Sequence, residues 1–190
     1  MHYGVVPTTV LAWPHSHVPF TVVALPFFTS IFLHGGWLHL IGNMWYLWIF
    51  GDKIEDRLGH FTYLIFYLLF GLGAGIVHTL LNSQTTVPSV GASGAIAGVL
   101  GAYMVSYPFA RVLTLVPIFI FLQVIEIPAV LLLVFWFLMQ FLYGAASLAS
   151  TSANAGGVAW WAHVGGFTIG IILVGLFPRK DRPRYGYSRS

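Results

Sequence analysis

The chain has 190 residues, of which 58% are hydrophobic and 7% charged, and its mean hydropathy is +0.85. This composition excludes a soluble domain, which needs a charged surface, and indicates an all-α polytopic membrane protein. The absence of cysteine excludes disulfides and thiolate metal sites. The formal net charge of +3 comes mostly from residues 179–184, a tail typical of a membrane-flanking anchor rather than of a nucleic-acid site.

The first segment, residues 1–33, is interrupted repeatedly by proline. Because proline breaks the interior of a helix, no membrane-length helix fits between these positions. We therefore expect residues 1–33 to form an irregular, partly interfacial loop. The prolines in question are Pro7, Pro14, Pro19 and Pro26.

Apolar segments further along the chain predict five membrane-spanning helices. They cover residues 36–50, 61–81, 93–108, 129–146 and 158–177. Between the third and fourth of them, residues 112–127 are rich in β-branched side chains and alternate weakly, which predicts a short interfacial hairpin. An uncharged polar loop at 82–88 precedes the third span, and a loop of small residues at 147–157 precedes the fifth.

The positions of lysine and arginine predict the orientation of the chain. All eight follow the first, third or fifth span, and the loops at 82–90 and 147–157 contain none. By the positive-inside rule the basic side is cytoplasmic, which makes residues 178–190 a basic cytoplasmic tail. We expect a multi-pass protein of a bacterial inner (plasma) membrane with a cytoplasmic C-terminus. Ser93 then begins its helix from the opposite, outer side.

Polar side chains inside apolar spans are costly and therefore mark candidate functional sites. Asn43 lies about 10 Å below Gly36, His39 lies one turn above it on the same face, and His163 lies about 8 Å into the last span. The span that Ser93 opens is only about 22 Å long, so Ser93 starts below the outer surface. These groups thus converge on similar depths. His78 has no evident partner and is interpreted as a snorkelling or interhelical hydrogen-bonding residue.

Small residues explain how the third and fifth spans could meet. Gly94 and Gly98 on one span, and Gly166 and Gly170 on the other, form small-xxx-small patterns that let helix backbones approach closely. We expect these spans to pack side by side, which would bring His163 to Ser93.

The chemistry of a serine nucleophile needs a base, donors for the oxyanion, and water. Histidine is the usual base for a serine hydroxyl, and all five carboxylates fall at or near the cytoplasmic side, so a Ser93–His163 dyad remains. The backbone N–H groups of Ser93 and Ala92, with the side chains of Asn43 and His39, would stabilise the oxyanion. Glycines at 91 and 94 leave room for a substrate backbone, and water would enter from the outer face.

Each feature also has an ordinary structural explanation. A Gly-x-Ser-Gly tetrapeptide in an apolar helix is more often packing than catalysis, and a single intramembrane histidine often makes an interhelical hydrogen bond. His39 and Asn43 could likewise join two helices. The four polar residues lie at one depth and on one side of the membrane, and this coincidence favours a catalytic site.

Several stretches together resemble the rhomboid intramembrane serine proteases. His34-Gly-Gly-Trp-Leu-His39-Leu-Ile-Gly-Asn43 is similar to the family's H-x4-H-x3-N motif, and Gly91-Ala92-Ser93-Gly94 to its G-x-S-G motif. Ala162-His163-Val-Gly-Gly166-Phe-Thr-Ile-Gly170 resembles its A-H-x-x-G-x-x-x-G helix, and Glu55-Asp-Arg57 its E-x-R. The match runs in order from about residue 27 to 177.

The resemblance implies a helical bundle around a water-filled cavity, a Ser93/His163 dyad, and His39 and Asn43 as oxyanion donors. It also implies cleavage of other proteins' transmembrane segments near their outer ends, without a cofactor. The helix at 129–146 and the loop at 147–157 would form a lateral gate and cap. The remaining motif residues would have structural roles: His34, Glu55, Arg57, Gly94, Gly98, Gly166 and Gly170.

One departure concerns the family's first transmembrane helix, which residues 1–33 cannot supply. Residues 34–177 are then the catalytic core with five spans, and residues 1–33 a remnant of the loop after the missing helix. The missing helix carries no catalytic residue in the family pattern, so the site assignments are unaffected.

Three rival functions fit the sequence less well. A catalytically inactive relative would bind transmembrane segments without cleaving them, but such relatives lose the dyad that this chain retains. A metalloprotease or metal transporter lacks an H-E-x-x-H helix and any acid at the depth of the histidines. A channel or carrier would need a polar path below Asn43, and the sequence offers none.

Overall fold

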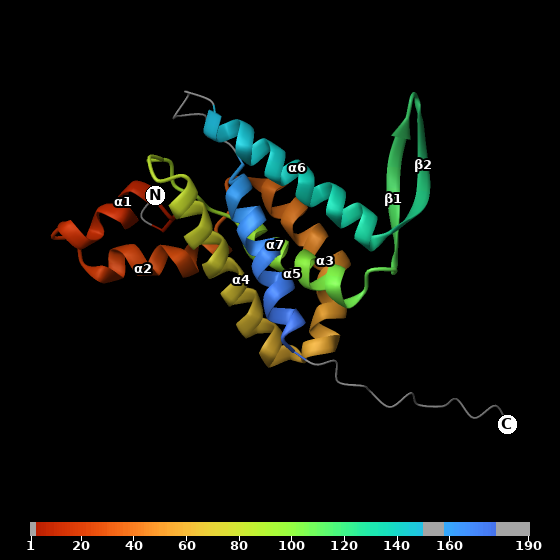
Figure 1. Cartoon of the computed structure of the whole chain (residues 1–190), viewed down its shortest axis with the longest axis horizontal. Helices are drawn as coiled ribbons and strands as arrows, with labels where there is room; N and C mark the ends of the chain where they lie inside the picture. The colour runs from red at the N-terminus through yellow and green to blue at the C-terminus, as the bar shows by residue number, and fades with distance from the viewer. Residues whose placement is uncertain (1–2, 150–157, 178–190) are drawn as a thin grey trace.

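The structure is a computed structural model that describes residues 3–149 and 158–177 (Figure 1). Most of the predicted loop at 147–157 and the whole predicted tail at 178–190 lie outside the described residues. The elements, in chain order, are α1 (Pro7–Ala12), η1 (Trp13–His15), α2 (Phe20–Thr29), η2 (Ser30–Phe32), α3 (Trp37–Leu58), α4 (His60–Leu81), α5 (Ser93–Ser106), β1 (Arg111–Ile118), β2 (Phe121–Pro128), α6 (Ala129–Ala149) and α7 (Trp160–Gly175).

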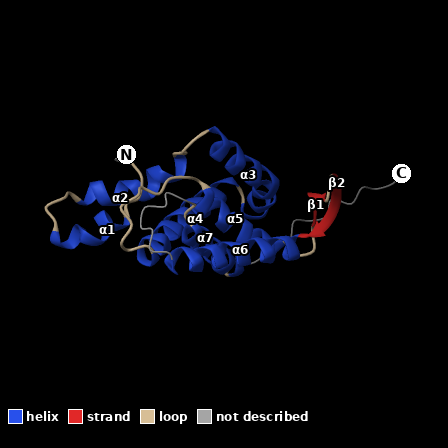
Figure 2. Cartoon of the chain, turned by 90° about the horizontal axis from the view of Figure 1, so that it is seen from above, coloured by secondary structure: helices blue, strands red, loops and turns tan. Residues whose placement is uncertain are grey.

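Helix α5 is the centre of the bundle. It packs against α3, α4, α6 and α7, and its contact with α7 is the most extensive between any two described helices. Nearly all its residues are buried, as expected for a helix that is apolar on every side. Figure 2 shows the α1–α2 segment and the β1–β2 hairpin at opposite ends of the long axis. Helix α5, whose first residue is Ser93, lies between them.

Two described helices, α4 and α6, are long and apolar enough to cross a membrane. A third span results if Phe20–Phe32 and Trp37–Leu58, which are bent by 76°, form one broken span. Helices α5 and α7 are apolar but have only 14 and 16 residues, about 21 and 24 Å. The predicted count of five spans therefore stays a prediction.

The N-terminal segment is not irregular, contrary to the expectation for residues 1–33. It forms the short helices α1 and α2 with 3₁₀ turns. Pro7 at the first turn of α1 and Pro19 at the N-cap of α2 mark helix starts, whereas Pro26 lies inside α2. At 6 and 10 residues, both helices are far shorter than a membrane span. Backbone bonds from Val5 to Ser89 and from Thr8 to Thr85 tie this segment to the loop before α5.

Helix α3 continues beyond the predicted end at residue 50, through the charged stretch to Leu58. It stops at Gly59, whose φ of +82° favours glycine. At this end the guanidinium of Arg57 donates to Ser106 Oγ on α5 at 2.5 Å and to the carbonyl oxygen of Phe177, after α7, at 3.0 Å. One side chain thus joins the C-terminal ends of three helices. Glu55 lies two residues earlier and pairs with His60 at 2.6 Å.

The predicted hairpin is present. β1 and β2 pair antiparallel in the register Arg111↔Pro128 to Ile118↔Phe121. The turn residue Phe119 has a φ of 55° and is 98% exposed. Arg111 and Glu126 lie 3.7 Å apart near the base.

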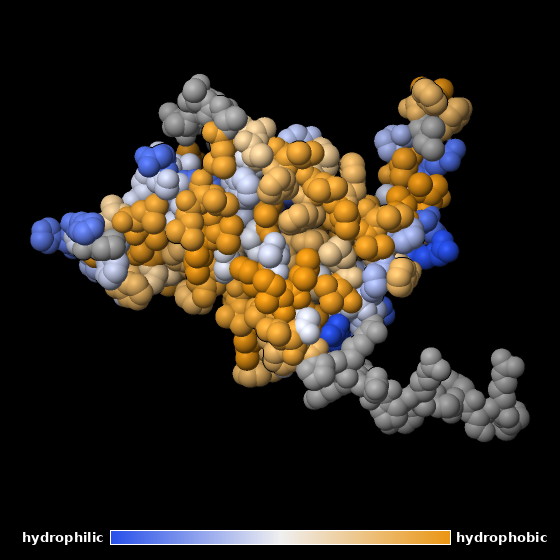
Figure 3. Space-filling view, in the orientation of Figure 1, coloured by the Kyte–Doolittle hydropathy of each residue, from blue (hydrophilic) through white to orange (hydrophobic). Residues whose placement is uncertain are grey.

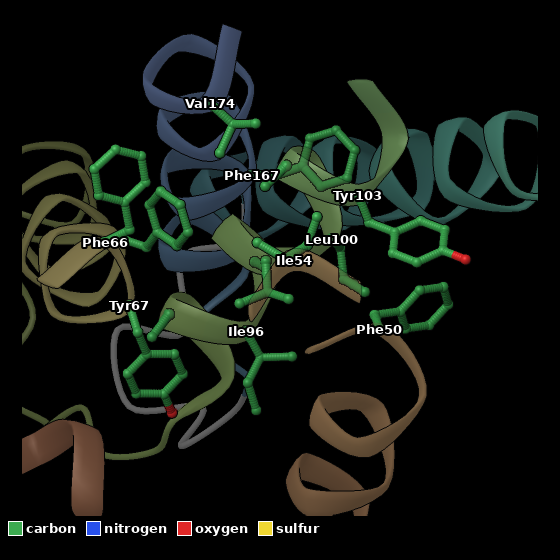
Figure 4. Packing of buried hydrophobic residues seen from close by; sticks show 14 of the residues in the cluster. Phe50, Ile54, Phe66, Tyr67, Ile96, Leu100, Tyr103, Phe167 and Val174 are labelled. Atoms are coloured by element: carbon green, nitrogen blue, oxygen red, sulfur yellow. The ribbon is translucent and has the colours of Figure 1, made fainter. Parts of the chain in front are cut away.

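The hydrophobic core lies between α3, α4, α5 and α7 (Figure 4). Phe70 and Ile54 are fully buried there, and Phe167 from α7 packs with them. Large apolar side chains are also exposed on the outer faces of the helices, and one face is mainly hydrophobic (Figure 3). An apolar exterior of this extent fits a protein surrounded by lipid.

Glycines hold α5 and α7 at backbone contact, and this generates a prediction. A methyl group on Gly170 would overlap the carbonyl oxygen of Gly98, whereas one on Gly175, in the same helix, would meet nothing within 4 Å. We expect Gly170→Ala to lower the free energy of unfolding by about 3 kcal/mol, since overpacking a tight contact forces the helices apart. Thermal unfolding in detergent micelles measures this. Equal unfolding temperatures for Gly170→Ala and Gly175→Ala would contradict the contact.

Candidate active site

Ser93 lies at the N-terminus of α5, after a backbone that turns sharply at Gly91. Gly91 has a φ of +132°, a conformation that favours glycine. Its N–H donates to the carbonyl oxygen of Ser30 at 2.9 Å, so Gly91 cannot supply a free N–H to a substrate oxygen. Within the described residues, the N–H groups of Ala92 and Ser93 have no hydrogen-bond partner, as is usual in a first helical turn. The role in substrate binding predicted for Gly91 can therefore only be to leave room for a substrate backbone, and not to donate a hydrogen bond.

Gly91 also brings His39 to Ser93. A β-carbon on Gly91 would lie 2.8 Å from His39 Nε2 and 3.7 Å from Ser93 Oγ, so the ring and the hydroxyl flank the same α-carbon. The N–H of Gly35 donates to His39 Nδ1 at 3.3 Å. In the neutral ring the proton is then on Nε2, the nitrogen beside Gly91. His39 therefore presents a donor next to Ser93.

The approach of α5 to α7 places His163 beside the start of α5. A methyl group on Gly166 would overlap the carbonyl oxygen of Gly94, and a β-carbon on Gly94 would lie 3.7 Å from the carbonyl oxygen of Ala162. The residue after Ala162 is His163, which is 8% exposed. The expectation that small residues let these two helices touch is met on α7, where Gly166 and Gly170 lie against the backbone of α5. On α5 it needs a correction: Gly98 faces Phe70 of α4, and Gly101 is the glycine that lies against the backbone of α7.

The ring of His163 is held by a residue from α6 that the sequence analysis did not single out. Its Nδ1 lies 2.8 Å from Gln140 Oε1. An amide oxygen only accepts hydrogen bonds, so Nδ1 carries the proton and Nε2 keeps its lone pair. Nε2 is buried and has no partner among the described residues. The available signal for Gln140 was its position as a polar side chain inside an apolar span.

No hydrogen bond joins Ser93 to His163 in the part of the chain that the structure describes. Both residues line one cavity of about 830 Å³. The cavity lies where α4, α5, α7 and the loop before α5 meet. Among the residues that line it are His39, His78, Asn82, Gly91, Ser93, Gly94, Trp160 and His163.

Asn43, Ala92 and His34 do not line this cavity. Asn43 is 7% exposed, and its amide nitrogen is buried without a partner among the described residues. His34 Nε2 is likewise buried without a partner among the described residues. The ring of His34 meets that of His39 edge-on, with 5.2 Å between the ring centroids. Asn43 lies one turn below His39 on α3, so both amide and imidazole are on the face that leads to Ser93.

His78, for which no partner was evident from sequence, has one in the structure. Its Nδ1 lies 3.2 Å from the amide nitrogen of Asn82, one turn further along the chain. Both residues belong to the cavity wall. For metals, residues 3–149 and 158–177 contain no group of three or more His, Cys, Asp or Glu side chains placed to hold an ion.

Comparisons with known proteins show which family this chain resembles. The sequence model of the Rhomboid domain matches residues 23–180. RHOMBOID-like protein 5 of Arabidopsis thaliana is 32% identical over 159 residues, which are 84% of this chain and 45% of that protein. Rhomboid-like protein 11, chloroplastic, of the same plant is 31% identical over 158 residues, or 80% of this chain and 52% of that protein.

A relative from an animal is similar to the same extent. Presenilin-associated rhomboid-like protein A, mitochondrial, of Danio rerio is 30% identical over 172 residues, or 84% of this chain and 40% of that protein. The chain thus spans about half the length, or less, of these relatives. Because the model of the Rhomboid domain matches most of its length, this chain is an integral membrane protein that belongs to the rhomboid family.

Proposed function

We propose that this chain is an intramembrane serine endopeptidase with Ser93 as nucleophile and His163 as base. The observation that carries the proposal is the state of His163. One ring nitrogen is bonded to Gln140, and the other is buried, unpartnered and part of the cavity that Ser93 also lines. A buried nitrogen without a partner is costly, so a site that retains one is typical of a group kept free for chemistry.

In the proposed mechanism, Ser93 Oγ attacks the carbonyl carbon of a scissile peptide bond while His163 Nε2 takes its proton. The same proton then passes to the leaving amine. Because Ser93 and His163 are not hydrogen-bonded in the free protein, the bond would form when substrate enters, as in many catalytic pairs that tighten on binding. Hydrolysis of the acyl-enzyme by water completes the cycle.

Four donors are proposed for the oxyanion. The N–H groups of Ser93 and Ala92 have no partner among the described residues, and His39 Nε2 lies against Gly91, which precedes them. The amide nitrogen of Asn43 is the fourth and has no partner within the described chain. Donors placed before the reaction stabilise the developing charge without reorganisation.

The rival proposal is a catalytically inactive member that binds transmembrane segments. Such a protein would have no use for a base nitrogen and an amide donor left unpaired in an apolar interior, which favours the enzyme. A metal-dependent mechanism has no support, since the candidate site contains histidines but no carboxylate beside them. The absence of a metal or other cofactor stays a prediction.

We further propose that the substrates are transmembrane segments of other membrane proteins, cut near their outer ends, and that α6 moves to admit them. The outer position of Ser93 follows from the placement of lysine and arginine on the opposite side. A cytoplasmic C-terminus has the same support. A bacterial inner membrane remains a prediction, because the relatives named above come from a plant and a fish.

Labelling with a fluorophosphonate probe tests the dyad, because the probe reacts with activated serines. We expect the native chain in detergent to be labelled, Ser93→Ala to be unlabelled, and His163→Ala to react roughly a hundredfold or more slowly. Ser89→Ala, which removes another cavity-lining serine, and His17→Ala, at an exposed position, are the matched controls. A folded native chain that is not labelled would favour the inactive rival.

The oxyanion assignment is tested separately by cleavage of a transmembrane reporter. We expect Asn43→Ala to lower kcat by roughly a hundredfold to a thousandfold, because one donor to the oxyanion is lost. Asn82→Ala is the matched control, since Asn82 lines the same cavity but bonds His78. Equal kcat values for the two variants would contradict the role of Asn43.

A further inference from the structure

We infer that Gln140 is a positioning residue for the base: it fixes the tautomer of His163 so that the lone pair is on Nε2. The catalytic role of Gln140 rests on the proposed function. The tautomer of His163 does not depend on it. Gln140 comes from α6 and is only 7% exposed. Its Oε1 lies 2.8 Å from His163 Nδ1, within a normal hydrogen bond.

The direction of this hydrogen bond decides the chemistry. A neutral imidazole carries one proton, and the partner of one nitrogen determines which of the two holds it. Since Oε1 cannot donate, the proton is on Nδ1 and the bond runs from the ring to the amide. Without that acceptor the proton could occupy Nε2, and a histidine protonated there cannot accept the proton of Ser93.

An amide suits this position better than a carboxylate. In soluble serine proteases an aspartate holds the histidine tautomer and stabilises the imidazolium that forms. In an apolar bundle a buried carboxylate is expensive, whereas a neutral amide fixes the same tautomer with one hydrogen bond. Glutamine therefore supplies the orienting function of a third catalytic member without adding a charge.

The origin of Gln140 on α6 adds a consequence. α6 packs on α7 through ring contacts, with Phe137 at 4.9 Å from Phe167 and Phe141 at 5.7 Å from Trp161. The indole N–H of Trp161 also donates to the carbonyl oxygen of Gly144 at 3.1 Å. If α6 moves away from α7, His163 Nδ1 loses Gln140 Oε1 as its hydrogen-bond acceptor. The base is therefore correctly protonated only while α6 is docked on α7.

Nitrogen-15 NMR of histidine-labelled protein in detergent micelles reads the tautomer directly. The signals of His163 are identified by their loss in His163→Ala. We expect the full native chain to show Nδ1 protonated and Nε2 unprotonated. In Gln140→Met, which keeps the length of the side chain but removes the acceptor, Nε2 becomes protonated in part or in full.

Function is measured on the same samples as the rate of fluorophosphonate labelling. We expect Gln140→Met to react about tenfold more slowly than the native chain, the cost of one lost hydrogen bond. Gln123→Met makes the same chemical change on the exposed strand β2 and should alter neither the tautomer nor the rate.

The outcomes separate this inference from the proposed function. A native His163 protonated on Nε2, or a tautomer that does not change in Gln140→Met, overturns the inference whatever the activity. A native Nδ1–H tautomer in a chain that the probe fails to label leaves the inference standing and refutes the dyad. The native measurement needs no variant, so it decides the tautomer even if Gln140→Met does not fold.

Discussion

The backbone contact between α5 and α7 is the constraint on which the rest of the structure depends. A side chain on Gly101 of α5, or on Gly166 or Gly170 of α7, would close the gap that lets these two helices touch. In lipid no hydrophobic force drives helices together, so close packing of small residues has to hold them. This contact sets Ser93, at the start of α5, beside the turn of α7 that carries His163. The candidate site is thus a consequence of how two helices pack.

Polar groups in this apolar bundle fall into two kinds. Arg57 donates to groups on α5 and after α7, and it joins the C-terminal ends of three helices. It does not belong to the lining of the cavity. His163, in contrast, bonds Gln140 through one ring nitrogen and lines the cavity together with Ser93. Position relative to the cavity therefore distinguishes a side chain that holds the bundle together from one that a substrate could reach.

Local sequence signals predicted the features that depend on local chemistry. The glycine spacing of α5 and α7, the hairpin at β1–β2 and the convergence of His39, Ser93 and His163 all follow from residue type and spacing. The α1 and α2 helices were missed because proline breaks a helix in its interior but favours its first turn. The bond from Gly91 to Ser30 and the bond from His163 to Gln140 join residues distant in sequence, and no periodicity signals them. Such contacts exist only after the helices have docked.

The distribution of helix contacts suggests where motion is least costly. α5 and α7 share backbone contact and cannot separate without opening the core, while α6 meets α7 mainly through aromatic side chains. A substrate that displaced α6 would therefore leave Ser93 and the contact between α5 and α7 intact, and would break the hydrogen bonds of His163 with Gln140 and of Trp161 with Gly144. Gln140 couples the displacement of α6 to the protonation of His163, because the hydrogen bond that fixes the tautomer of His163 is also a contact that holds α6 in place. On this proposal, the pair α5 and α7 keeps Ser93 and His163 close together, and the docking of α6 determines whether Nε2 of His163 can accept a proton.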